Sequence, residues 1–249
     1  MMRIEQTVRS AVAGAVGLAL GGLAAVQRCV VPVAARSQPS AMLRIEDARR
    51  PAVALTIDDG PSARTAEVLD LLAEHGATAT FFVHTDHIDA TPGGEASVRR
   101  ILRDGHELGN HMPSDTPSIA LSDEAFAAAF AESDARLRGL GALPRLFRPA
   151  GGAYSRKKMD AVLARHGYEP RYVLGSYLPW DVAIPLPERY ADHLAGLAYP
   201  GAILVLHDGD HTGPARIERT LTTLRRLLRR LTERGYAARS IADARAAQL

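Results

Sequence analysis

The chain has little of several features that would narrow its class. Its 249 residues include one cysteine, Cys29, which excludes a disulfide within the chain. Aromatic residues make up 5% of the chain and the formal net charge is +2, so the stacking platforms and basic surface typical of nucleic-acid-binding proteins are lacking and no nucleic-acid partner is expected. Of 30 basic residues, all but Lys157 and Lys158 are arginines. The hydrophobic content of 47% indicates a globular protein with a substantial core.

The first forty residues differ in composition from the rest. Arg3 and Arg9 precede an uncharged run at 10–27 that is rich in Ala, Gly, Val and Leu, which is typical of an export signal or a single membrane anchor. The sequence leaves cleavage and anchoring open, and either predicts an exported protein. We expect three parts: a signal peptide or membrane anchor at 1–36, a linker at 37–48 and one folded domain at 49–249.

Short apolar runs alternate with helical patterns throughout the predicted domain, which favours repeated β-α units and a parallel sheet. The helix expected from Pro214 has one apolar stripe, and we expect its arginines on the other face to be solvated. This alternation is typical of a parallel barrel or an open doubly wound sheet, and both place reactive residues at the carboxyl ends of strands. The predicted strands are 52–57, 78–83, 107–108, 146–148, 172–174, 202–206 and 237–241.

The first of these strand ends carries two adjacent carboxylates. Asp58 and Asp59 follow the apolar run at 52–57, and a Gly-Pro turn comes next. One carboxylate is suited to bind a divalent metal and the other to act as a base on water. An Asx-turn or a helix cap explains such a pair almost equally well when it stands alone.

Further polar residues follow later strands. His111 and Asp115 are four positions apart and suit one divalent ion. Arg148 and Asp181 lie in two other loops rich in chain-breaking residues, and His207 follows the run Ile-Leu-Val-Leu, where burial can tune an imidazole for acid catalysis. A surface role is common for any one of these residues, but their coincidence at five strand ends favours a single site.

The motifs together resemble the polysaccharide deacetylase family, carbohydrate esterase family 4, which contains the NodB homology domain. Five ordered motifs match between Thr56 and His207, and Thr-Ile-Asp-Asp-Gly-Pro at 56–61 is the most specific. The resemblance implies an α/β fold, a distorted (β/α) barrel of about seven parallel strands in a single catalytic domain at 49–249. It also implies a divalent metal, with zinc as the usual ion.

The resemblance assigns roles to the matching residues. Asp58 matches the catalytic base and Arg148 the arginine that positions it. His207 matches the general acid and Asp181 the carboxylate that tunes it. The metal ligands that match are Asp59 and His111, and Asp115 stands where the family usually has histidine. A ligand set with two carboxylates broadens the plausible metals to manganese, cobalt or iron beside zinc, and we expect a subgroup that carries this aspartate.

Other residues are expected on the substrate side of the site. Gly151 replaces an aromatic residue of the third motif, and its backbone N–H is an expected oxyanion donor. Gly152, Tyr154 and Trp180 are the other candidates for substrate contacts, and Trp180 precedes Asp181 where the family has a following tryptophan. His84 follows the second strand, and we expect a substrate-side or surface role for it rather than metal ligation.

The resemblance implies a metal-dependent hydrolase that removes acetyl groups from an N-acetylated polysaccharide or oligosaccharide of the peptidoglycan or chitin type. The resemblance implies water activated by the metal as nucleophile, with an aspartate base and a histidine acid. An O-acetyl-xylan esterase, another amidase on the same fold and a carbohydrate-binding pseudoenzyme remain alternatives. We expect a monomer whose partner is a carbohydrate.

Overall fold

The computed structural model describes residues 33, 37–46, 51–177, 179, 181, 184, 186–208 and 214–246. Strands and helices alternate through most of this part of the chain. The strands are β1 (Ala41–Met42), β2 (Ala52–Asp58), β3 (Thr80–Val83), β4 (Glu107–Asn110), β5 (Tyr172–Val173), β6 (Ile203–His207) and β7 (Ala237–Arg239). The helices are α2 (Thr65–Glu74), α3 (Thr85–Ala90), α4 (Gly94–Arg103), α5 (Asp123–Gly139), α6 (Arg156–Arg165), α7 (Pro187–Leu197), α8 (Pro214–Glu233) and α9 (Ile241–Ala246), with a 3-10 turn at Ser118–Ala120.

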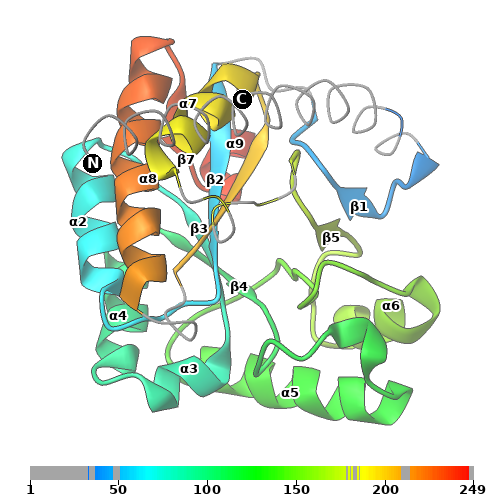
Figure 1. Ribbon diagram of the computed structural model, residues 1–249. Helices are drawn as coiled ribbons and strands as arrows, with labels where there is room; N and C mark the ends of the chain where they lie inside the picture. Colours follow the sequence, from blue (N-terminus) through cyan, green and yellow to red (C-terminus); the bar gives the residue numbers. More distant parts are fainter. Residues whose placement is uncertain are drawn as a thin grey trace, which may run out of the picture.

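Strand β2 lies at the centre of the main sheet (Figure 1). The order is β4-β3-β2-β6, and β7 pairs with the first part of β2. Strands β1 and β5 form a second, two-stranded sheet. Every pairing between named strands is parallel. The predicted α/β class with parallel strands is therefore confirmed.

Single bridges connect the two sheets. Phe147 pairs with Asn110 at the end of β4 and with Tyr172 in β5, and Arg44 pairs with Ala202 just before β6. The predicted strand at 146–148 is thus reduced to isolated bridges, because Pro144 and Pro149 on either side have no N–H to extend a ladder. Together, the strand pairings and the single bridges follow the order of strands around a barrel. Among the described residues, they do not form one continuous ladder of hydrogen bonds.

Apolar side chains from both sheets fill a small interior core, and larger clusters lie under the surrounding helices. Helix α8 shows how the sequence builds these outer layers, because its predicted apolar stripe is buried while Arg225 and Arg229 are exposed. Ser122 caps α5 by accepting a hydrogen bond from the backbone N–H of Ala125 at 3.1 Å. The interior core consists of Met42, Ile45, Ala54, Phe82, Leu146, Val173, Ile203, Ile241 and Ala244.

The segment predicted as a linker, 37–48, contributes to the domain instead. Ala41 and Met42 form β1 and pair in register with β5. Met42 is fully buried and Ile45 is 3% exposed. The prediction of a linker was wrong because the apolar side chains of Met42 and Ile45 complete the interior core.

The predicted signal peptide or anchor at 1–36 lies, apart from Val33, outside the described residues, as does Trp180. Within the residues that the structure describes, no helix combines the length and the hydropathy that a membrane span requires.

Candidate metal-dependent hydrolytic site

Three adjacent parallel strands each end in a residue that can bind a metal. Asp59 follows β2, His84 follows β3 and His111 follows β4. The ladder continues past the strand ends, because the N–H of Asp59 donates to the carbonyl of Phe82 at 3.1 Å and the N–H of His111 donates to that of Val83 at 3.2 Å. The register of the sheet therefore brings the three side chains to one edge.

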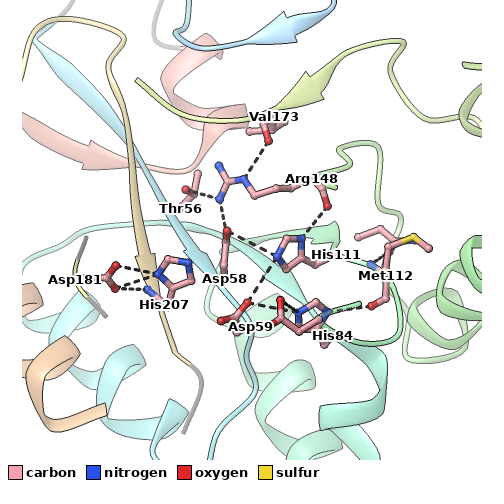
Figure 2. A network of polar contacts seen from close by, with 12 residues as sticks. Thr56, Asp58, Asp59, His84, His111, Met112, Arg148, Val173, Asp181 and His207 are labelled. Atoms are coloured by element: carbon pink, nitrogen blue, oxygen red, sulfur yellow. Dashed lines mark hydrogen bonds and ion pairs between the residues drawn. The ribbon is translucent and has the colours of Figure 1, made fainter. Parts of the chain in front are cut away.

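The three side chains converge on one point (Figure 2). Oδ1 of Asp59 lies 3.4 Å from Nε2 of His84 and 3.6 Å from Nε2 of His111. The two imidazole rings stack with their centroids 4.5 Å apart. One ligand atom from each residue lies within 4.8 Å of the others, and all three residues are buried.

Backbone carbonyls orient both imidazoles. Nδ1 of His111 lies 2.7 Å from the carbonyl oxygen of Arg148, and Nδ1 of His84 lies 3.4 Å from that of Met112. Because a carbonyl oxygen only accepts hydrogen bonds, Nδ1 carries a proton in each ring, and Nε2 is the ring nitrogen that faces Asp59 and is placed to bind a metal. Among the described residues, the buried Nε2 of His84 has no hydrogen-bond partner. Burial lowers the pKa of His111 to about 4, which keeps this ring neutral.

This donor set suits a divalent cation. Two imidazoles and one carboxylate are ligands that zinc and related metals accept in catalytic sites. An imidazole nitrogen buried without a partner is costly in an apolar interior, and a metal ion would compensate for that cost. The backbone of Asp59 has φ 70°, a left-handed conformation that is uncommon for residues other than glycine and that often occurs at functional sites.

The residues that gather differ from the predicted ligand set. Asp115 was predicted as the third ligand and His84 as a substrate contact. In the structure, His84 is fully buried beside Asp59 and His111, whereas the side chain of Asp115 is 70% exposed and its Oδ1 lies 3.9 Å from Nε2 of His84. The difference arises because His84 directly follows β3, the strand between β2 and β4, whereas Asp115 lies four residues beyond His111 in an open loop.

Asp58 lies beside this cluster and is held by Arg148. Nη1 of Arg148 donates to Oδ1 of Asp58 and, at 2.9 Å, to the hydroxyl of Thr56, while its Nε donates to the carbonyl of Val173 at 3.1 Å. The guanidinium also lies over the ring of Phe82, 4.3 Å from the centroid. Oδ2 of Asp58 points toward Nε2 of His111 at 3.9 Å. The predicted pairing of Asp58 with Arg148 is present.

His207 lies across β2 from the histidine cluster, because β6 pairs with β2 with Asp58 opposite His207. Nδ1 of His207 lies 2.9 Å from Oδ1 of Asp181, and its backbone N–H donates to Oδ2 at 2.9 Å. Burial alone lowers the pKa of His207, but the charge and hydrogen bond of Asp181 outweigh it, and Asp58 and Asp59 act in the same direction. The pKa is raised to about 9, so His207 carries a proton at neutral pH.

Asp208, directly after β6, connects this strand to the segment that follows β2. Its carboxylate is fully buried and accepts hydrogen bonds from the hydroxyls of Ser62 at 2.8 Å and Thr65 at 2.5 Å. Its backbone N–H donates to the carbonyl of Asp58 at 2.8 Å. Asp208 was not among the predicted site residues, although its place directly after His207 was a usable signal.

Arg216 was also missed by sequence reasoning. It lies in the first turn of α8, is 8% exposed, and its Nη2 donates to Oδ2 of Asp59 at 2.8 Å. Nothing in the sequence separates it from the solvated arginines later in the helix.

The remaining predicted residues lie in the loop that precedes α6. Gly151 and Gly152 have φ of 76° and 71°, and a Cβ on Gly151 would meet Cβ of Pro117 at 3.1 Å. Tyr154 stacks on Tyr172 with ring centroids 4.2 Å apart, and its hydroxyl donates to Gln38 at 3.0 Å. The predicted substrate roles of these residues stay predictions.

The chain is similar in sequence and in fold to known proteins. The family model described as Polysaccharide deacetylase matches residues 46–170. A chitooligosaccharide deacetylase from Rhizobium leguminosarum bv. trifolii is 31% identical, over 75% of this chain and 88% of the relative. A peptidoglycan-N-acetylglucosamine deacetylase from Bacillus cereus is 33% identical, over 74% and 83%. A family 4 acetyl xylan esterase from Clostridium thermocellum, solved with a cobalt ion, is similar in structure with a TM-score of 0.65 and 28% identity, over 78% of this chain and 89% of that one.

Proposed function

Because the chain belongs to the polysaccharide deacetylase family, we propose that it is a metal-dependent hydrolase that removes acetyl groups from an N-acetylated polysaccharide or oligosaccharide. The convergence of Asp59, His84 and His111 beside the Asp58–Arg148 pair carries this proposal, because it combines metal ligands with a candidate base. The named relatives act on chitooligosaccharide or peptidoglycan, which supports a polymer of N-acetylhexosamine as substrate.

The metal would be held by Asp59, His84 and His111. When bound there, a divalent cation supplies a Lewis acid for hydrolysis of the acetyl amide. Zinc is our first choice because the set contains two imidazoles, and manganese, cobalt and iron are the alternatives.

The residues around the ligands supply proton transfer. Asp58, paired with Arg148, takes a proton from the attacking water. His207, kept protonated by Asp181, gives its proton to the departing amine nitrogen as the C–N bond breaks. The backbone N–H of Gly151 is the proposed donor to the oxygen that becomes negative in the tetrahedral intermediate. The products are acetate and the free amino sugar.

The proposal also specifies that the acetyl group is attached to nitrogen rather than to oxygen. The structural similarity to an acetyl xylan esterase makes removal of O-acetyl groups the second candidate. A carbohydrate-binding pseudoenzyme is disfavoured, because the candidate base, acid and both of their partners are in place.

The test is acetate release by the full chain from chitin oligomers, peptidoglycan fragments and acetylated xylan, with zinc, manganese, cobalt and iron each supplied. We expect release from the N-acetylated substrates that a chelator abolishes. Asp58→Asn should reduce it by about 100-fold to 10,000-fold, because the base is lost. Asp123→Asn, an exposed change at the start of α5, is the matched control and should leave the rate unchanged.

Two results would contradict this function. A folded protein that binds metal and sugar without releasing acetate would be a binding protein. Release from acetylated xylan alone would make it an esterase.

We also propose that the chain is exported, because a positively charged start precedes the uncharged run at 10–27. Export would bring the site to cell-wall polymers. Fractionation of cells that express the full chain tests this, and recovery only in the cytoplasm would contradict it.

A further inference from the structure

The two carboxylate oxygens of Asp59 face different groups. Oδ1 lies 3.4 Å and 3.6 Å from the two imidazole Nε2 atoms, whereas Oδ2 accepts a hydrogen bond from Nη2 of Arg216 at 2.8 Å. A carboxylate can bind a metal through one oxygen or through both. With Oδ2 engaged by the guanidinium, one oxygen of Asp59 is presented to the metal site.

The contact is anchored by the surrounding fold. Ile217, the next residue of α8, is 2% exposed, and the hydroxyl of Thr220, one turn further along, donates to the backbone carbonyl of His207 at 2.8 Å. The start of α8 is thereby tied to β6, which pairs with β2. Arg216 is itself buried, so its guanidinium has little room to leave Asp59.

Each of the two adjacent aspartates is paired with an arginine. Asp58 is compensated by Arg148 and Asp59 by Arg216. Loss of Arg216 would free Oδ2 and leave the ligand cluster with one additional uncompensated negative charge. Both effects favour tighter binding of a divalent cation.

We propose that Arg216 is a positioning residue that restricts Asp59 to one-oxygen ligation and so keeps a coordination position open for substrate. Catalytic metal sites keep such an open position, whereas in structural sites protein ligands fill every position. This inference rests on the proposed metal site, and it extends the function to a residue outside the family motifs.

The test compares Arg216→Met with the parent protein and with Arg225→Met, an exposed arginine of the same helix. Metal affinity is measured by competition with a chromophoric chelator, and coordination is followed by the visible absorption of bound Co²⁺, which weakens as coordination exceeds four. We expect Arg216→Met to bind metal about tenfold more tightly, with a weaker Co²⁺ band and a kcat reduced by about 10-fold to 100-fold. Arg225→Met should match the parent in all three measurements.

Thermal unfolding without metal shows whether Arg216→Met folds. If it does not, Arg216→Lys is the second variant, because lysine keeps the positive charge and N–H donors for Asp59. We expect its metal affinity to stay within about threefold of the parent. An unchanged affinity and Co²⁺ spectrum in Arg216→Met, or weaker binding in a stably folded variant, would overturn the proposal. Both measurements need no substrate, so an absence of acetate release in the parent would count against the proposed function alone.

Discussion

The two sides of the site differ in how their polar groups are satisfied. On the proton-transfer side, Asp58 is paired with Arg148 and His207 with Asp181, each within the protein. On the metal side, two imidazoles direct Nε2 toward one oxygen of Asp59, and Nε2 of His84 has no hydrogen-bond partner among the described residues. Polar groups that are paired within the protein are suited to exchange protons. A buried nitrogen without a hydrogen-bond partner in the protein is suited to bind an ion.

The largest expected effect is a loss of metal affinity when a residue of the metal side is removed. His84→Ala should weaken metal binding by about 100-fold or more, because removing a ligand costs at least as much as removing a partner of a ligand. Asp115→Ala is the matched variant and should change the affinity by less than about threefold, because its side chain is 70% exposed. Isothermal titration of the metal-free protein with zinc measures both.

The double variant His84→Ala, Asp115→His sharpens this test. Because Asp115 lies close to His84, an imidazole at position 115 should recover part of the lost affinity. The opposite pattern, with affinity lost in Asp115→Ala and kept in His84→Ala, would restore the ligand set predicted from the sequence.

The next largest effect is a pH-dependent loss of kcat/KM when the proton-transfer side is changed and the metal stays bound. In the parent protein, His207 should remain protonated until the pH rises through about 9. Asp181→Asn removes the charge that raises this pKa, so burial then dominates and His207 loses its proton at lower pH. The loss of kcat/KM should be about tenfold greater at pH 8 than at pH 6.

A pH–rate profile between pH 5 and 10 with metal content measured in parallel checks this prediction. An equal loss at every pH would mean that Asp181 acts only by holding the backbone N–H of His207.

The smallest expected effect lies outside both sides. Tyr154→Ala should raise KM by about threefold to tenfold and leave kcat and metal affinity unchanged, because Tyr154 is proposed to contact substrate away from the reacting bond. Tyr154→Phe keeps the stack on Tyr172 and should behave almost like the parent. A drop in kcat with unchanged KM would instead place Tyr154 near the chemistry.

Much of the proton-transfer side was predictable, because Asp58, Arg148 and His207 belong to motifs whose order along the chain is informative. The metal side was less so. Spacing suggested that His111 and Asp115 share an ion, but the sheet register decided which side chains meet, and it placed His84 between β2 and β4. Each of the gathered residues directly follows one of three adjacent parallel strands, but the predicted strands at 52–57 and 107–108 end too early to identify Asp59 and His111 in this way.

Other parts of the structure depended on contacts that no local pattern reveals. Arg216 lies in a helix rich in similar arginines, and only the packing of α8 against β6 directs it to Asp59. The strand β1 is two residues long, and its pairing with β5 joins positions far apart in the chain. Short strands and long-range ion pairs of this kind carry almost no periodic signal.

The attachment of β6 to β2 also has a consequence for when the protein becomes active during folding. The hydroxyl of Thr56 reaches the carbonyl of Leu204, 148 positions away, and Ser62 reaches Asp208, 146 positions away. Closing loops of this length is a slow step compared with forming the helices between them. A nascent chain carries all three metal ligands long before His207 is synthesised, and its base and acid come opposite each other only when β6 docks. We therefore expect partly folded chains to be catalytically silent, so that hydrolysis begins only with the completed domain.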